Sequence, residues 1–261
     1  MRIFVLLLTS LVITSTAFAA LKTQNVEYTQ DGVLLEGYLA YDDQFAGKRP
    51  GVLVVHEWMG LNDYARMRAD MLARLGYVAF AADIYGKGIR PATADDANAE
   101  ASKYKADRPL LQERVKAGLV VLKGQANVDP GRTAAIGYCF GGTAVLELAR
   151  SGADVKGIVS FHGGLSNPDP RDAKNIKAPV LVLHGADDPF VSPQEVAAFE
   201  QEMKDAGVMY TLIKYPGAVH GFTNPGNKGE MKGAMYNAEA DQKSWEQMRQ
   251  FFDRLFKQDA R

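Results

Sequence analysis

Residues 133–142 read Thr-Ala-Ala-Ile-Gly-Tyr-Cys-Phe-Gly-Gly. An apolar run leads into a glycine-rich turn, and a second apolar segment, 143–149, follows, so the stretch predicts a strand, an abrupt turn and a helix. Gly137 and Gly141 each stand two residues from Cys139, which is the spacing of the G-x-nucleophile-x-G elbow. In such an elbow the neighbours must be small because the chain turns sharply, and the central side chain is held out at the start of the helix.

Cys139 takes the place that serine usually occupies in this elbow, and it is the only cysteine in the chain. The positive end of the helix dipole favours the thiolate, which is the nucleophilic form of the side chain. A small buried cysteine in a glycine-rich turn is the alternative interpretation, because short motifs also occur by chance.

The composition is that of an ordinary globular protein, with 261 residues, 47% of them hydrophobic, and a formal net charge of -1. This length accommodates one large α/β domain or two small ones. The near-neutral charge gives no reason to expect nucleic-acid or membrane-surface binding. A single cysteine excludes an intrachain disulfide, and four scattered histidines without an H-E-x-x-H motif do not indicate a zinc site. We therefore expect no metal and no other cofactor.

The first 19 residues have the pattern of a secretory signal peptide. Met1-Arg2 gives a positive start, residues 3–13 are mostly apolar, and Ala17-Phe18-Ala19 forms an A-x-A cleavage site. The apolar core is too short for a transmembrane anchor, and no cysteine lies near the cleavage site to carry a lipid. We expect cleavage before Ala20, a secreted or periplasmic protein without stable membrane insertion, and a mature domain spanning 20–261.

Apolar periodicity after this leader predicts an opening hairpin and then alternating buried strands and helices. The hairpin pairs 25–29 with 33–41 around Asp31-Gly32, a dipeptide typical of tight turns. Further strands are expected at 51–56, 77–83, 133–136, 155–161, 179–183 and 210–214, and helices at 61–75, 97–105, 110–123, 192–206 and 238–256. The aromatic stripe of the last helix is expected to be core packing. No linker or internal repeat divides the chain, so these elements predict a single α/β domain with a doubly wound, mostly parallel sheet and an antiparallel N-terminal hairpin.

Functional side chains gather where the strands of such a sheet end. A cysteine nucleophile needs a base within hydrogen-bond reach and an acid that orients the base. The α/β-hydrolase order is nucleophile, acid and then histidine, and His220 is the only histidine that follows both Cys139 and the acidic pair Asp187-Asp188. Spacing alone does not choose between the two aspartates, because one of them is expected to cap the turn or the following helix.

Five motifs, taken together, resemble the dienelactone hydrolase family. They lie at 56–60, 83–86, 137–142, 188–191 and 220–222. The resemblance covers nearly all of the chain after the signal peptide, and its most specific parts are the G-Y-C-x-G-G elbow and the H-E-x-x-G strand exit. It implies a single-domain α/β-hydrolase with a Cys-His-Asp triad that cleaves cyclic enol-lactones or related esters through an acyl-cysteine.

By this resemblance the triad is Cys139, His220 and Asp188, with the D-x-F-V pattern selecting the acid. The resemblance also gives Glu57 a part, since in the family this glutamate contacts the thiol and helps to form the thiolate. A surface carboxylate or a local cap is the alternative for Glu57. Two backbone N–H groups are expected to form the oxyanion hole: that of Phe140, directly after the nucleophile, and by resemblance that of Trp58.

The expected substrate contacts depart from the family pattern. Family members hold a substrate carboxylate with arginines, whereas this chain has Lys87, with Arg90 nearby, at the first position and Asn224 at the second. Lysine binds a carboxylate as a point charge and lacks the two-pronged geometry of arginine. Lys87, Arg90 and Tyr85 are the candidates for substrate binding, and solvated loop charge is the alternative for the two cations.

The sequence therefore predicts an exported, monomeric hydrolase that cleaves small ester or lactone bonds through acyl-Cys139. A general carboxylesterase or thioesterase is one alternative. A non-catalytic protein that uses the same fold only to bind a ligand is another, although a binding module has no need of a complete triad. His56, at a strand end, is expected to belong to the scaffold.

Overall fold

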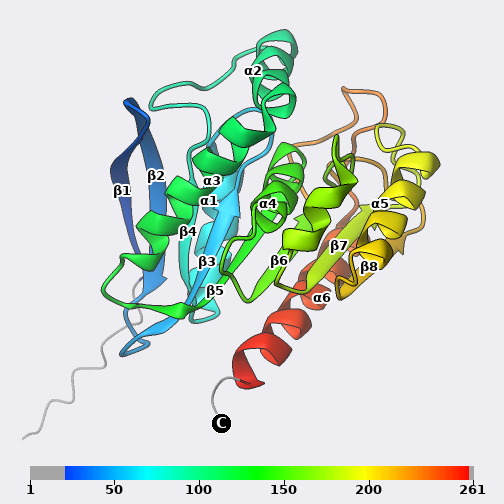
Figure 1. Cartoon of the computed structure of the whole chain (residues 1–261). Helices are drawn as coiled ribbons and strands as arrows, with labels where there is room; N and C mark the ends of the chain where they lie inside the picture. Colours follow the sequence, from blue (N-terminus) through cyan, green and yellow to red (C-terminus); the bar gives the residue numbers. More distant parts are fainter. Residues whose placement is uncertain (1–20, 259–261) are drawn as a thin grey trace, which may run out of the picture.

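The computed structural model describes residues 21–258, so the predicted signal peptide and its cleavage site lie outside the described residues. One eight-stranded sheet runs through the domain in the order β1-β2-β4-β3-β5-β6-β7-β8 (Figure 1). The strands are β1 (Leu21–Gln30), β2 (Val33–Asp42), β3 (Arg49–Val55), β4 (Val78–Ala82), β5 (Val128–Tyr138), β6 (Gly157–Phe161), β7 (Val180–Gly185) and β8 (Tyr210–Tyr215). Each overlaps its predicted range, and β5 is longer than predicted because it begins at Val128.

The hairpin forms the edge of the sheet. Asp31 and Gly32 have φ values of 48° and 73°, and two positive values suit the tight turn that matches the twist of paired strands. The hairpin strands are antiparallel to each other, β2 is antiparallel to β4, and all later pairs are parallel. The predicted mostly parallel sheet with an antiparallel N-terminal hairpin is therefore confirmed.

Helices cover both faces of the sheet. They are α1 (Asp63–Arg74), α2 (Ala94–Ala106), α3 (Arg108–Lys123), α4 (Phe140–Arg150), α5 (Pro193–Asp205) and α6 (Ala238–Gln258). Buried side chains of α2, α3, α4 and α5 share one apolar cluster, and those of α1 and α6 share the other (Figure 1). Because both faces are covered, the central strands are apolar throughout, as Val52, Leu53, Val54 and Val55 of β3 show with no exposed surface.

Side-chain caps determine where several helices begin. Asn62, Thr93, Asp107 and Ser192 each accept a hydrogen bond from a backbone N–H of the first turn. In α6 the predicted aromatic stripe is indeed core, since Met248 and Phe252 are fully buried. A short 3-10 helix, η1 (Pro170–Asn175), lies between β6 and β7, where the sequence predicted no element.

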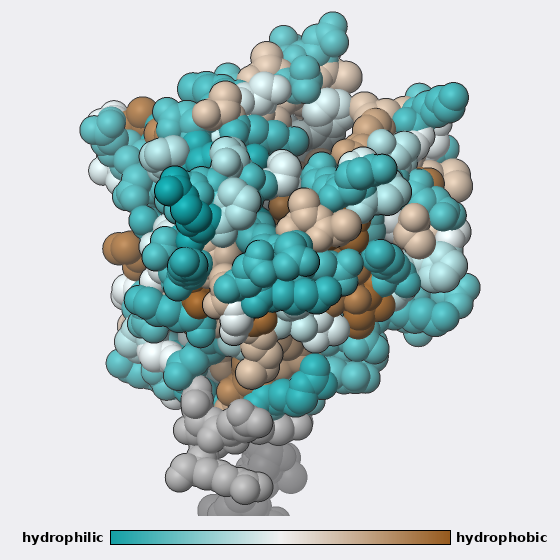
Figure 2. All heavy atoms as spheres, turned by 45° about the vertical axis from the view of Figure 1, so that its right-hand side comes forward, coloured by the Kyte–Doolittle hydropathy of each residue, from teal (hydrophilic) through white to brown (hydrophobic). Residues whose placement is uncertain are grey.

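The surface of the domain is largely polar. Figure 2 shows one face covered mainly by hydrophilic side chains, with apolar ones in small groups. Within residues 21–258, none of the helices combines the length and the apolar character needed to cross a bilayer.

Candidate active site

The turn at Cys139 has the strained geometry of a nucleophile elbow. Cys139 lies between the last residue of β5 and the first of α4, with φ 53° and ψ -115°. A Cβ atom on Gly137 would lie 1.9 Å from the carbonyl oxygen of Gly141, and one on Gly141 would lie 2.1 Å from that of Val55. Neither glycine can therefore be replaced without moving the backbone, which explains the glycine spacing in the sequence.

Cys139, His220 and Asp188 form a continuous hydrogen-bonded line. His220 Nε2 lies 3.1 Å from Cys139 Sγ, and His220 Nδ1 lies 2.8 Å from Asp188 Oδ2. His220 stands in the loop after β8, and its backbone is fixed by hydrogen bonds to Gly233 and Met235. The structure thus brings together three residues that are far apart in the sequence.

The structure also separates the two neighbouring aspartates. Asp188 has a fully buried side chain and, besides contacting His220, accepts a hydrogen bond from the N–H of Phe190. Asp187 is exposed and accepts from the N–H of Gly217, 3.1 Å away. Asp187 therefore holds the turn that leads to His220, while Asp188 contacts the imidazole itself.

The environment favours a charged His220. Burial alone would lower its pKa, but the charge of Cys139 and the hydrogen bonds with Asp188 and Cys139 together raise the pKa of His220 to about 10. An imidazole with this pKa is protonated at neutral pH when a thiolate lies beside it. The arrangement can therefore hold Cys139 as the anionic partner of an ion pair.

Glu57 is a buried carboxylate at the exit of β3. Its side chain accepts a hydrogen bond from Asn224 Nδ2 at 2.5 Å. Burial raises the pKa of Glu57 to about 7, against the opposing effects of Asn224 and of the charges of His220 and Arg68. Glu57 therefore changes its protonation close to neutral pH, and it lines the same cavity as Cys139. The alternative interpretation of Glu57 as a surface carboxylate is therefore excluded, since the residue is buried.

These groups open into a cavity of about 440 Å³. Its apolar lining includes Trp58, Met59, Phe190, Val191 and Met231, and its polar lining includes Asn98, Lys105, Asn224, Asn227 and Glu230. Phe140 also lines it and is the first residue of α4, so its backbone N–H has no acceptor within the helix. The two residues predicted to supply the oxyanion hole thus line the same cavity as Cys139.

The three predicted substrate contacts lie elsewhere. Tyr85 is buried and donates its hydroxyl to the carbonyl oxygen of Trp58 at 2.9 Å. Lys87 pairs with Glu27 and Glu36 of the hairpin. The structure does not bring Tyr85 or Lys87 to the cavity lining.

Arg90 is also absent from that lining. Its guanidinium donates to the carbonyl oxygens of Leu61 and Ile89, both at 2.6 Å, and lies 3.5 Å from Asp83. Arg90 therefore ties its own loop to the exit of β3. A lysine does line the cavity, namely Lys105 in the last turn of α2.

His56 belongs to the scaffold, as predicted. Its Nδ1 lies 2.6 Å from the carbonyl oxygen of Glu57, and its Nε2 accepts from the N–H of Ile84. Burial lowers the pKa of His56 to about 4, so the ring is neutral at ordinary pH. It braces the two strand exits that flank the cavity.

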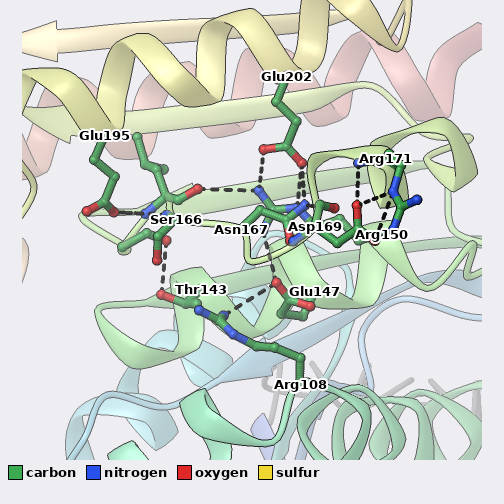
Figure 3. Close-up of polar contacts among 12 residues, drawn as sticks. Arg108, Thr143, Glu147, Arg150, Ser166, Asn167, Asp169, Arg171, Glu195 and Glu202 are labelled. Carbon is green, nitrogen blue, oxygen red and sulfur yellow. Dashed lines mark hydrogen bonds and ion pairs between the residues drawn. The ribbon is translucent and has the colours of Figure 1, made fainter.

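A second polar cluster supports the far end of α4 and the loop after β6 (Figure 3). Arg150 is fully buried and donates to Glu147 and to both carboxylate oxygens of Glu202. Glu195 accepts from the backbone N–H of Leu165 and Ser166, at 2.6 and 2.9 Å. The loop that carries Gly164, another residue of the cavity lining, is thereby fixed to α4 and α5.

No group of three or more histidine, cysteine, aspartate or glutamate side chains in the described part of the chain is arranged to hold a metal ion. The residues gathered around Cys139 are suited to nucleophilic attack followed by proton transfer through an imidazole.

Comparison with known proteins agrees with this geometry. The model of the dienelactone hydrolase family matches residues 35–256. Protein usf from Aquifex pyrophilus is 32% identical over 206 residues, which cover 77% of this chain and 87% of that protein. A solved structure described as m3DLH is 41% identical with a TM-score of 0.88, over 90% of this chain and 99% of that one. A dienelactone hydrolase-like promiscuous phosphotriesterase from metagenomic libraries is 39% identical with a TM-score of 0.87, at the same two coverages. The chain therefore belongs to the dienelactone hydrolase family and has the α/β fold of its hydrolases.

Proposed function

We propose that this protein hydrolyses small ester or lactone bonds through an acyl-cysteine formed on Cys139. The observation that carries the proposal is the 3.1 Å contact between Cys139 Sγ and His220 Nε2, with Asp188 on the other imidazole nitrogen. The cavity of about 440 Å³ is large enough for a small-molecule substrate.

In the first half of the reaction the Cys139 thiolate attacks the carbonyl carbon. The negative charge moves to the carbonyl oxygen, and we expect the backbone N–H groups of Phe140 and Trp58, two residues of the cavity lining, to donate to it. The tetrahedral intermediate collapses when the carbon–oxygen bond of the ester breaks. The proton on His220 Nε2 goes to the leaving oxygen, and a thioester on Cys139 remains.

In the second half a water molecule replaces the alcohol. His220, now neutral, takes a proton from the water as the water attacks the thioester carbonyl. Collapse of the second tetrahedral intermediate releases the acid and restores the thiolate beside protonated His220. Asp188 keeps its hydrogen bond to Nδ1 throughout and stabilises the imidazolium.

Trapping of the intermediate tests this function. p-Nitrophenyl acetate is mixed with the protein, and the reaction is quenched in acid before intact-mass and peptide analysis. We expect an added acetyl mass on the peptide containing Cys139 and no turnover by Cys139→Ala. Equal turnover by wild type and Cys139→Ala would contradict the proposal.

Phosphotriester hydrolysis is a second candidate, favoured by one comparison. The 39% identical structure is that of a promiscuous phosphotriesterase, and a thiolate beside two N–H donors could attack phosphorus as it attacks a carbonyl carbon. Paraoxon hydrolysis by wild type but not by Cys139→Ala would support this activity. A panel of lactones, aryl esters and thioesters, run in parallel, would rank the acyl substrates.

We further propose that the protein is exported. The proposal rests on the signal-peptide pattern of residues 1–19. N-terminal sequencing of the protein recovered from a periplasmic or secreted fraction is expected to begin at Ala20. Recovery of the uncleaved chain from the cytosol alone would contradict it.

A further inference from the structure

Two strained residues meet beneath the elbow. Among the described residues, only Asp31, Cys139 and His162 have a positive φ without being glycine. Asp31 lies in the hairpin turn, whereas Cys139 and His162 contact each other: the N–H of Cys139 lies 3.1 Å from His162 Nδ1. Such backbone strain persists only where the surrounding structure enforces it, and it is concentrated at functional sites.

His162 is fixed on every side. It follows β6 directly, has no exposed surface, and donates its backbone N–H to Leu183 at 2.9 Å. Its ring packs edge to face with those of His220 and Phe222, with centroids 5.4 and 5.2 Å away. The ring therefore stands between the backbone of Cys139 and the imidazole that Cys139 contacts.

The hydrogen bonds define one tautomer of His162. A backbone N–H can only donate, so Nδ1 must be the acceptor and the proton must be on Nε2. Nε2 lies 2.7 Å from Thr223 Oγ1 and donates to it. Burial, together with the charges of His220, Arg68 and His184, lowers the pKa of His162 well below its ordinary value. The ring therefore remains neutral while His220 is protonated.

The line of contacts continues into a buried ion pair. Thr223 Oγ1 lies 2.6 Å from Tyr64 Oη, to which Arg68 Nε donates at 3.2 Å. Arg68 also donates to the carbonyl oxygen of Thr223 and to Asp241, both at 2.6 Å. The Nε2 side of His162 is thus anchored to α1 and α6, which leaves its Nδ1 side to hold the elbow.

We propose that His162 is a positioning residue for the nucleophile. Its neutral ring holds the backbone N–H of Cys139, shared with the carbonyl oxygen of Phe161, in the conformation that directs Sγ at His220. The inference rests on the proposed role of Cys139 as nucleophile. His162 acts through the backbone of Cys139 and through no contact with the reacting atoms.

Three substitutions of His162 distinguish the hydrogen bond at Nδ1 from the hydrogen bond at Nε2. In His162→Asn the amide oxygen takes the place of Nδ1, and asparagine tolerates a positive φ. In His162→Gln the amide reaches Thr223, but the side-chain acceptor for the N–H of Cys139 is lost and only the carbonyl oxygen of Phe161 remains. His162→Gly permits the backbone conformation without strain and also removes the acceptor, so it distinguishes loss of the acceptor from strain.

The expected result is a graded loss of kcat on p-nitrophenyl acetate. His162→Gln and His162→Gly are expected to lower kcat about 10- to 100-fold, since a small displacement of a reacting group has effects of this size. His162→Asn is expected to stay within about threefold of wild type, because the acceptor is retained. KM is expected to change little in all three. His184→Asn is the matched control, since His184 is equally buried at the next strand end and its Nδ1 has no hydrogen-bond partner among the described residues.

Two further readouts distinguish positioning from packing. The pH dependence of Cys139 alkylation by iodoacetamide is expected to move to higher pH in the Gln and Gly variants and to stay in place in the Asn variant and the control. In the wild-type protein, ¹⁵N NMR of the imidazole nitrogens is expected to show His162 with Nδ1 unprotonated and Nε2 protonated. The NMR measurement is made on the wild-type protein, so it gives a result even if the Gln and Gly variants do not fold. The Asn variant is needed only to assign the His162 signals.

A proton on Nδ1, equal losses in the Asn and Gln variants, or wild-type kcat in the Gly variant would each overturn the inference. Turnover by Cys139→Ala would instead overturn the proposed function. Because it is measured on a different variant, the two failures can be told apart.

Discussion

Helix α4 has buried ionisable groups near both of its ends, and the two groups differ in whether each charge has an oppositely charged partner. At the C-terminal end, Arg150, Glu147 and Glu202 have side chains that are 0%, 1% and 3% exposed, and each charge faces an opposite charge (Figure 3). Arg150 adds a hydrogen bond to the carbonyl oxygen of Leu165. Arg108 contacts Glu147 as a second cation. The charges of these four residues therefore balance, which is the condition under which buried charges are tolerated.

At the N-terminal end the partners are incomplete. The buried carboxylate of Glu57 has an amide rather than a cation as its hydrogen-bond partner, and its pKa rises to about 7. Burial opposes a charged His220, but the charge of Cys139 and the hydrogen bonds with Asp188 and Cys139 raise the pKa of His220 to about 10. The comparison shows that this fold can neutralise buried charge where rigidity is needed. It leaves groups close to a change of protonation where chemistry is proposed.

The largest expected effect is on activity and comes from a substitution at the N-terminal end of α4, where Cys139 and His220 lie. His220→Ala removes the imidazole that contacts Cys139 Sγ, so kcat/KM for p-nitrophenyl acetate is expected to fall on the order of 10,000-fold. The free energy of unfolding is also expected to fall, by about 1 to 3 kcal/mol, because the buried carboxylate of Asp188 loses His220 and keeps the N–H of Phe190 as a hydrogen-bond partner. Steady-state kinetics and urea unfolding measure the two quantities. A loss of activity below tenfold would contradict the role of His220.

The neighbouring aspartates provide a matched control for this end. Asp188→Asn changes the group that holds His220 Nδ1 and is expected to lower kcat at least about 100-fold. Asp187→Asn changes only the acceptor for the N–H of Gly217, and kcat is expected to remain within about threefold. Equal effects of the two substitutions would mean that the contact with His220 is not what matters.

A substitution in the charge cluster at the C-terminal end of α4 is expected to lower the free energy of unfolding and to leave the activity unchanged. Arg150→Met leaves Glu202 buried without its cation, so the free energy of unfolding is expected to fall by about 3 to 5 kcal/mol. Turnover per folded molecule is expected to stay within about twofold, because the cluster makes no contact with Cys139 or His220. Urea unfolding and active-site titration with iodoacetamide give both numbers.

The double substitution Arg150→Met, Glu202→Met is the control for that prediction. It removes both partners, while Glu147 keeps Arg108 and Gln112, and most of the lost stability is expected to return. If the double variant is as unstable as the single one, loss of packing rather than an unpaired charge explains the effect.

The raised pKa of Glu57 predicts a pH-dependent stability. Between 4.5 and about 7 the folded protein retains a proton on Glu57 that the unfolded chain has released. Stability therefore falls as the pH rises through this window, by on the order of 3 kcal/mol. Glu57→Gln removes this loss, because the amide stays neutral and its oxygen can accept from Asn224.

At pH 8 the Glu57→Gln variant is therefore expected to be more stable than wild type by up to that amount, and at pH 4 the two are expected to be alike. Urea unfolding at both pH values measures the difference. Glu230→Gln is the matched control, because Glu230 lines the same cavity but is exposed. A Glu57→Gln variant no more stable than wild type at pH 8 would show that ionisation of Glu57 does not destabilise the folded protein.

The sequence predicted the parts of the molecule that are set by local rules. The two glycines around Cys139 are required by backbone contacts within the turn and with β3, so their spacing is visible in the sequence. Chain order limited the base to His220. The choice of Asp188 needed the family resemblance, because Asp187 and Asp188 differ only in which one the fold turns toward the imidazole.

Other contacts depend on tertiary structure and left no local pattern. Lys87 follows the expected motif, but the hairpin brings Glu27 and Glu36 beside it. Lys105 reaches the cavity from a helix rather than from a strand exit, which is where the functional side chains of such a sheet are expected. His162 follows β6 directly, but nothing in the sequence indicates its hydrogen bond to the backbone of Cys139, in which both residues have a positive φ.

The smallest expected effect concerns these two lysines and tests which of them a substrate encounters. Lys105→Ala is expected to lower kcat/KM for an ester that carries a carboxylate about two- to threefold relative to a neutral ester, since a solvent-exposed charge contributes little. Lys87→Ala is the matched control and is expected to leave this ratio unchanged, because its ammonium pairs with Glu27 outside the cavity. Added salt is expected to reduce the effect of Lys105. If Lys87→Ala changes the ratio instead, the loop after β4 must move toward the cavity when substrate binds, and the predicted substrate contact at Lys87 would be restored.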